Sequence, residues 1–255
     1  ELISRSLAGI RKNGLVKRLE SSFYAFQVSL DNFRQANKNM IDMFNRDKVF
    51  IAPDLDINNL LESGYTDEEI EEKLNAKAED NPKNSVFKAE DFKPEFIEML
   101  QSDQDTLEKM CKAWEKITDA DDSKFAKFNE LLKHELFKED RNPEQKLVVF
   151  SESVDTVKYL ERRINRKDVL VISADNRSKL FKTIRENFDA NYKTKLNDYN
   201  IILTTDVLAE GVNLHRANVI VNYDTPWNST RLMQRIGRVN RIGSVSKHIY
   251  NYVFY

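Results

Sequence analysis

Cysteine and histidine are scarce in this sequence. Its 255 residues contain one cysteine, Cys111, and three histidines that lie far apart. A single cysteine excludes an intramolecular disulfide, and so few histidines leave little from which a Cys/His metal cluster could be built. We therefore predict no metal site made by these residues, so that any metal ion would bind carboxylates or arrive with a ligand.

Long apolar runs are also missing. No run approaches the roughly 18 residues that a membrane span needs, and the first residues show no charged-then-apolar leader. We therefore expect a cytoplasmic protein without a membrane partner. The chain starts at Glu1 and not at methionine, and we expect it to be an excised fragment.

The charge is present but unevenly distributed. The net charge is -2, yet residues 1–53, 54–140, 141–200 and 201–255 carry +4, -13, +4 and +3, counting Lys and Arg against Asp and Glu. This asymmetry predicts that a polyanion meets the two ends of the chain and not the middle. We interpret the acidic middle as a solvated helical surface.

The apolar pattern changes along the chain. Up to about residue 140 apolar residues recur at helical spacing, apart from a short strand-like run at 49–52, and Thr66 with Glu69 forms a capping-box signal. Ser123 is expected to cap a helix that continues to Leu136. The division predicted is a helical linker (1–53), an acidic helical insertion (54–120) and an α/β domain (121–255).

Short runs rich in Val, Ile and Tyr follow in the second half, most of them separated by helical patterns. They are LVVF (147–150), VLVI (169–172), IILTT (201–205), VIVNY (219–223) and HIYNYVF (248–254). Continuous apolar runs are typical of parallel strands covered on both faces, so the alternation predicts a doubly wound parallel α/β sheet. Ligands bind at the carboxyl ends of such strands. This points to the polar residues after the runs, including Ser151, Glu152, Ser173, Thr204 to Asp206, Tyr223 and Asp224.

Two segments near these ends carry the candidate chemistry. TTDVLAEGVNL (204–214) combines hydroxyls, carboxylates and a glycine in one turn, a mixture that suits phosphate, although such a turn is as often only a capped strand-to-helix connection. In the expected helix 229–241, the buried stripe would be Leu232, Met233, Ile236 and Val239. Gln234, Arg238 and Arg241 would project toward the strand ends. Gly237 and Gly243 favour close approach of another surface, and guanidinium groups suit an anionic one, although charge runs are often only solvated.

The motifs TTDVLAEGVNL, YDTPWNS and QRIGRVNRIG, in this order, resemble the fifth and sixth motifs of superfamily 2 helicases and translocases, particularly the Swi/Snf-like bacterial branch. KLVVFSESVDTVKYL resembles the fourth motif, and KRLESSFYAF is similar to the helical segment that joins the two lobes. Ser229 and Ser244 stand where proline and glutamine are commoner, and Ala174 replaces an expected glycine. These departures weaken the assignment to the sub-branch and leave the assignment of the arginines unchanged.

The resemblance implies a RecA-like lobe that is the second of two, with ATP and Mg²⁺ between them and the metal held mainly by the first lobe. Arg238 and Arg241 would reach the triphosphate as catalytic residues, and Gln234, Asp206, Gly211 and Asn213 would complete the ATP site. The nucleic-acid track, expected to be double-stranded DNA, would be met by Ser151 and by Thr204 or Thr205. Trp227 would either pack the motif loop or approach DNA.

The phosphate loop of such motors is missing. GIRKNG (9–14) has the glycine spacing, but Leu15 and Val16 stand where Lys and Ser or Thr are required, so the fragment alone is predicted to be inactive as an ATPase. Two other classes remain open. One is a non-catalytic nucleic-acid-binding module, which the basic flanks favour. The other is a regulatory or metabolic nucleotide-binding domain, although no strand is followed by a glycine-rich dinucleotide turn.

Overall fold

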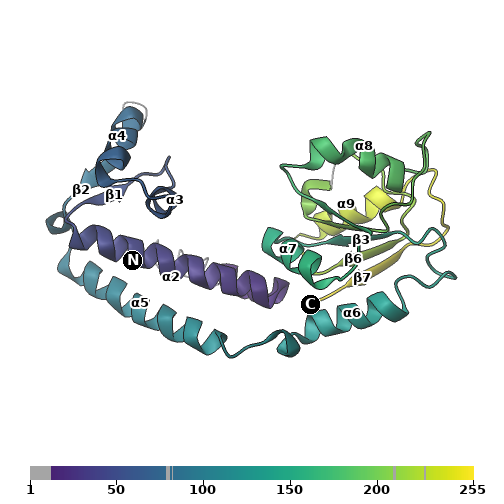
Figure 1. The fold of residues 1–255 in the computed structure, drawn as a ribbon, viewed down its shortest axis with the longest axis horizontal. Coiled ribbons are helices and arrows are strands. Elements are labelled where there is room, and N and C mark those ends of the chain that lie inside the picture. The colour runs from purple at the N-terminus through teal and green to yellow at the C-terminus, as the bar shows by residue number, and fades with distance from the viewer. Residues whose placement is uncertain (1–12, 79–80, 82, 209–210, 227) are drawn as a thin grey trace. The chain divides into compact units, whose positions relative to one another are not determined.

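The computed structural model describes residues 13–78, 81, 83–208, 211–226 and 228–255 (Figure 1). The chain divides into two compact units, one made of residues 1–28 with 118–255 and the other of residues 29–117. The division falls inside α2 (Phe23–Asn45), so this helix begins in the first unit and continues into the second. The predicted boundaries at 53/54 and 120/121 stay predictions.

The first unit is built on a five-stranded, fully parallel sheet. Its strands are β3 (Leu147–Phe150), β4 (Val169–Ile172), β5 (Ile201–Thr204), β6 (Val219–Asn222) and β7 (Tyr250–Val253), in the order β4-β5-β3-β6-β7. The predicted parallel α/β fold preceded by a helical region is therefore confirmed. The three central strands β3, β5 and β6 are buried at every residue, as their continuous apolar runs indicated.

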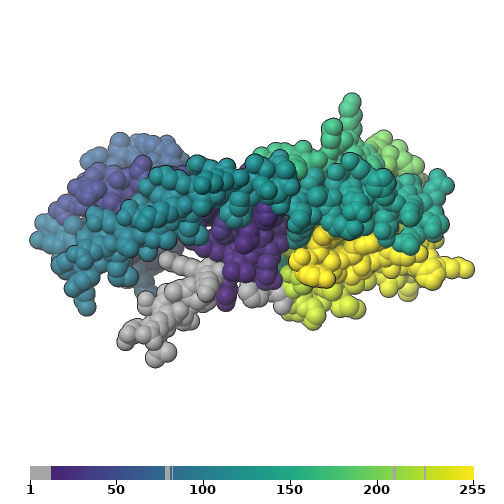
Figure 2. Space-filling model, turned by 90° about the horizontal axis from the view of Figure 1, so that it is seen from below, coloured from purple at the N-terminus to yellow at the C-terminus, as the bar shows by residue number. Residues whose placement is uncertain are grey.

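Helices cover both faces of this sheet. Alternate strand residues such as Leu147 and Val149 pack with α6 (Ser123–His134) and α7 (Val154–Arg163), whereas Val148 and Phe150 pack with α8 (Arg177–Phe188) and α9 (Ser229–Val239). The two-residue period of a strand explains this division, because successive side chains point to opposite faces. At the β7 edge of the sheet the Tyr252 hydroxyl donates to Glu135 at 2.8 Å, where the yellow C-terminal segment lies beside teal residues in Figure 2.

The second unit combines helices with a small hairpin of strands. It contains most of α2, then β1 (Val49–Ile51), α3 (Ile57–Glu62), α4 (Asp67–Ala78), β2 (Ser85–Phe87) and α5 (Pro94–Trp114), with short 3₁₀ turns. β1 was predicted from its apolar run, but β2 was not, since it becomes a strand by pairing antiparallel with β1. The core of this unit contains Met43, Phe50, Ile70 and Leu74. No helix in the described ranges is long and apolar enough to cross a membrane.

Two helix starts test the capping signals of the sequence. The Thr66 amide donates to Glu69 at 2.8 Å and the Glu69 amide to the Thr66 hydroxyl at 3.3 Å, so the predicted capping box is confirmed. The prediction that Ser123 caps α6 is wrong. Asp122 is the cap, because its carboxylate accepts from the Phe125 amide at 2.8 Å.

Candidate functional site

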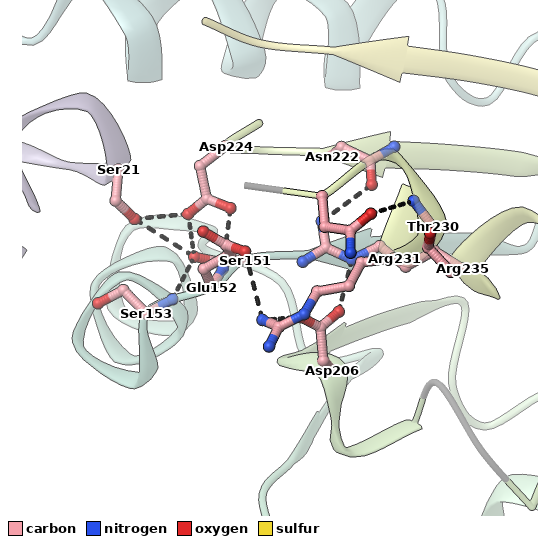
Figure 3. A network of polar contacts seen from close by, with 11 residues as sticks. Ser21, Ser151, Glu152, Ser153, Asp206, Asn222, Asp224, Thr230, Arg231 and Arg235 are labelled. Carbon is pink, nitrogen blue, oxygen red and sulfur yellow. Dashed lines mark hydrogen bonds and ion pairs between the residues drawn. The ribbon is translucent and has the colours of Figure 1, made fainter. Parts of the chain in front are cut away.

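The candidate site lies at the carboxyl ends of β3, β5 and β6, where parallel strands present the residues that follow them (Figure 3). Phe150 of β3 is paired with Thr204 of β5 on one side and with Asn222 of β6 on the other. Polar residues from all three strand ends therefore meet at one edge of the sheet. α9, which carries the arginines, packs beside this edge.

Arg235 anchors α9 to the strand ends. Its side chain is 0% exposed. Its Nε donates to Asp206 at 2.6 Å and its Nη1 to the Asn222 side chain at 3.0 Å, while the guanidinium carbon lies 5.3 Å from the Phe150 ring centroid. A buried guanidinium is tolerated only when such partners compensate for its lost hydration. Arg235 is thus a structural anchor of the site.

Arg231, one turn earlier on α9, occupies the exposed side of the same network. Its side chain is 53% exposed, and its Nη1 lies 3.3 Å from Asp206 and 3.4 Å from Glu152. The helix begins beside it, because the Asn228 side chain accepts from the Thr230 amide at 2.8 Å. Exposed ion pairs of this kind contribute little to stability. Both Arg231 and Arg235 contact Asp206, but the contact of Arg235 therefore stabilises the fold more.

Asp224, just after β6, forms a second polar centre. Its carboxylate accepts from the hydroxyls of Ser151 and Ser21, each at 2.6 Å, and from the Glu152 amide at 2.8 Å. Asp224, Ser151 and Ser21 are all buried. Three donors compensate for the burial of this carboxylate, so this centre holds its neighbours in place.

A cavity of about 530 Å³ opens beside Asp224. Its lining combines helical residues Lys17 and Arg18 with Glu152, Arg231 and Tyr255, among others. Both signs of charge are present in this lining, and neither Arg238 nor Arg241 belongs to it. The predicted phosphate-facing arginines therefore lie elsewhere on the edge of the sheet.

Arg238 lies in the last turn of α9, whereas Arg241 lies two residues beyond it, because the helix ends at Val239 and not at residue 241 as expected. Arg241 is exposed, its Nη1 donates to the Asn213 side chain and its Nε donates to the Gly237 carbonyl at 3.2 Å. No carboxylate forms an ion pair with Arg241 among the residues that the structure describes. Arg238 is half-buried in the last turn of the helix. The structure thus joins predicted residues Arg241 and Asn213 and leaves the Arg241 guanidinium accessible to an anion.

Other predicted ATP-site residues lie along the same edge. Gln234 is exposed on α9, and Asp206 is engaged by Arg235 and Arg231. Gly211 has a φ of +85°, a left-handed conformation that favours glycine. The structure therefore separates two groups, with Asp206 in the anchoring network and Asn213 beside Arg241.

The residues predicted to meet nucleic acid differ in accessibility. Thr204 is 0% exposed, and its hydroxyl lies 3.2 Å from the Ile172 carbonyl and 3.0 Å from the Thr205 carbonyl. Ser151 is also buried and bonded to Asp224, whereas Thr205 is half-buried. Of the two threonines, Thr205 is the accessible one. Trp227 lies outside the described residues.

The expected apolar stripe of α9 is wrong in one position. Val239 is buried and Leu232 and Ile236 are half-buried, but Met233 is 65% exposed. Arg235 takes a core position instead, because Asp206 and Asn222 supply its polar partners. Near Gly237 the structure has no atom within 4 Å of the place where a Cβ would lie, so the described chain itself does not require glycine there.

Sequence reasoning missed several members of the network. Ser21 lies in the KRLESSFYAF segment, yet its contact is with Asp224, 203 positions away. Glu152, Asn222 and Asp224 were recognisable only as residues at strand ends, without an assigned partner. The described residues contain no group of three or more His, Cys, Asp and Glu side chains placed to hold a metal ion.

The fold and site define a parallel α/β domain with an arginine-bearing helix at the carboxyl edge of its sheet. Residues 123–243 match the family model of the helicase conserved C-terminal domain. This part of the chain is therefore similar to the helicase conserved C-terminal domain.

Individual relatives match shorter stretches. The chain is 48% identical over 52 residues to the uncharacterized ATP-dependent helicase YqhH of Bacillus subtilis, covering 20% of this chain and 9% of that protein. It is 31% identical over 114 residues to the probable ATP-dependent RNA helicase ddx51 of Dictyostelium discoideum, covering 43% and 20%. The solved C-terminal part of the Fun30 ATPase domain aligns over 89% of this chain and 80% of its own, with 16% identity and a TM-score of 0.42. The match to these helicases thus spans a fifth or less of their length.

Proposed function

We propose that this chain is the second motor lobe of an ATP-dependent DNA translocase or helicase of the Swi/Snf-like branch, acting in the cytoplasm. The first lobe would belong to the same polypeptide. The observation that carries the proposal is the contrast between buried Arg235, which fixes α9, and exposed Arg241, just after the helix, which forms no ion pair with a carboxylate among the described residues. The domain match over residues 123–243 supports it.

The residues at the end of α9 fit a triphosphate. Arg241 offers a planar guanidinium that can form paired hydrogen bonds to phosphate, and Arg238 and Gln234 lie on α9, which ends two residues before Arg241. Bound ATP with Mg²⁺ would supply the transferable phosphoryl group. Because the described residues form no acidic metal cluster, the ion would be held mainly by the other lobe.

Arg241 would act by placing positive charge where negative charge develops on the phosphoryl group. Removing an arginine finger typically lowers the rate by about 10³ to 10⁵. Asn213 would orient the Arg241 fork through its side-chain oxygen. Arg235 and Asp206 would act indirectly, by holding α9 against the strand ends.

The test uses the complete polypeptide that contains this chain. Arg241→Ala should lower kcat for ATP by about 10³ or more, and Arg241→Lys should rescue only part of the loss because the bidentate fork is gone. Lys182→Ala is the matched control, since it removes an exposed positive charge from α8. Full-speed hydrolysis after both Arg238 and Arg241 are replaced by alanine would overturn the proposal.

Two further measurements separate the rival functions. The 255-residue chain alone should show little or no magnesium-dependent ATPase activity, because it contains no phosphate loop. A non-catalytic nucleic-acid-binding module would instead show salt-dependent DNA binding that Arg241→Ala leaves unchanged, in a complete protein without ATPase activity. Stimulation of the ATPase by duplex DNA, single-stranded DNA and RNA would be compared in parallel, with duplex DNA expected to be strongest.

A further inference from the structure

A break between two helical segments lies against the strand ends of the first unit. Residues 13–21 are helical, Ser22 is not, and α2 begins at Phe23. The Ser22 hydroxyl accepts from the Ala25 amide at 3.0 Å and so caps the start of α2. Lys124 of α6 donates to the carbonyl groups of Glu20 at 2.5 Å and Ser21 at 3.3 Å, which places a cation at the end of the first segment.

A buried chain of hydroxyl groups connects this break to Asp224. Ser22 and Thr156 lie 2.8 Å apart, Thr156 and Ser21 2.7 Å, and Ser21 and the Asp224 carboxylate 2.6 Å. An ionised carboxylate only accepts, so Ser21 donates to Asp224, Thr156 donates to Ser21 and Ser22 donates to Thr156. Hydrogen bonds arranged head to tail in a buried site strengthen one another.

The ends of β3 and β6 also hold α9, the helix that carries Arg235. Phe150 and Asn222 are paired across β3 and β6, and they contact Arg235 of α9. Ser151 follows Phe150 directly, and Asp224 lies two residues after Asn222. The last residues of β3 and β6 therefore hold α9, and the residues that directly follow these strands hold the helical break (Figure 3).

We propose that Asp224 is a positioning residue that couples the helical segment 13–28 to α9, so that displacement of this segment shifts the arginine helix. The proposal rests on the proposed function, in which α9 faces ATP, and on the resemblance of residues 17–26 to the helical segment that joins the two motor lobes. The contacts are local, because Asp224 binds Ser21 and Asn222, two residues earlier at the end of β6, binds Arg235. A second set of contacts that could couple the two elements consists of the ion pairs of exposed Arg231 with Glu152 and with Asp206.

The first test follows amide hydrogen exchange in this chain. Ser21→Ala should accelerate exchange in residues 13–28 about tenfold or more, the size expected for losing a hydrogen bond to a charged group. If the coupling exists, exchange in α9 should also rise, by about 2- to 30-fold, while α8 stays unchanged. α8 is the internal reference because it packs on the same face of the sheet as α9 but is not part of the hydroxyl chain.

Ser63→Ala is the matched control. It removes a serine hydroxyl that donates to Asn59 at 3.1 Å on the surface of the other unit, and it should leave α9 unchanged. Asp224→Asn should reproduce the effect of Ser21→Ala, because the amide keeps the size but loses the charge. Faster exchange confined to residues 13–28, equal acceleration of α8 and α9, or no change at all would each overturn the coupling.

A second readout uses the complete polypeptide. Ser21→Ala should lower the DNA-stimulated kcat several-fold with little change in KM for ATP, since Ser21 touches neither the strand-end arginines nor Asn213. An unchanged stimulated kcat would overturn the coupling in the motor. A polypeptide with no ATPase activity would instead overturn the proposed function, and the exchange experiment would still decide whether Asp224 links the two elements.

Discussion

Replacing Arg235 with methionine should destabilise the first unit far more than the same replacement at Arg231. Both arginines contact Asp206, but the Arg235 side chain is 0% exposed and that of Arg231 is 53% exposed. Breaking a buried ion pair costs about 3 to 5 kcal/mol because one charge is left without a partner. Asp206 is 24% exposed and can partly rehydrate, which reduces this cost toward about 3 kcal/mol.

A second loss adds to the first. Arg235→Met also removes the donor to the buried Asn222 side chain, and an unsatisfied buried acceptor costs about 1 to 3 kcal/mol. Methionine fills much of the vacated space, so we expect a net loss of about 3 to 4 kcal/mol. Arg231→Met removes only an exposed pair and should cost about 0 to 1 kcal/mol.

The assay must report on the first unit alone, because two compact units can unfold in separate transitions. Urea-dependent hydrogen exchange at the buried amides of β3 and β5 meets this requirement, since these amides exchange only when the sheet opens. Arg235→Lys should fall between wild type and Arg235→Met, because lysine keeps the charge without the fork. A difference below about 1 kcal/mol between the two methionine variants would refute the assignment of Arg235 as the anchor.

Three further predictions concern the same unit. Burial lowers the pKa of Lys146 from 10.5 to about 8, so the folded state binds fewer protons between these values and stability should rise with pH across that window. Urea titrations at several pH values should show a smaller rise for Lys146→Met. Arg216 donates to the Glu144 carboxylate at 3.0 Å and to the Leu196 carbonyl at 2.8 Å, so Arg216→Ala should cost about 3 kcal/mol and expose the loop after α8 to proteolysis. Asp122→Ala should cost about 2 kcal/mol or more in thermal or urea unfolding by removing both the α6 cap and the acceptor of the Tyr159 hydroxyl at 2.6 Å, whereas Asp122→Asn should retain most of the stability.

The sheet was predictable because its signals are local. Each central strand is a continuous run of apolar residues, and such runs indicate burial on both faces wherever they occur. The capping box of Thr66 and Glu69 is equally local, since its partners lie three residues apart. The error at Ser123 has the same origin, because Asp122 and Ser123 are both good caps and the sequence alone does not choose between neighbours.

The polar network was not predictable in the same way. Burial of Arg235 depends on Asp206 and Asn222, which lie 29 and 13 positions earlier and meet only when β5 and β6 are in one sheet. A helical pattern assigns an arginine to the exposed face, and Met233 to the buried one. The available signal was an acidic residue and an amide at the ends of two strands, which together can compensate for one buried guanidinium.

These contacts decide what holds α9 in place. Its fully buried side chains are Arg235 and Val239, so a polar anchor carries much of the attachment that an apolar stripe would otherwise provide. The two directional hydrogen bonds of Arg235, to Asp206 and to Asn222, fix the orientation of its side chain more narrowly than apolar contact does, and Arg235 therefore sets the rotation of the helix about its axis. Arg241 lies six residues later and takes its orientation from that rotation. A change at Asp206 should consequently misplace Arg241 even in a variant whose sheet remains folded.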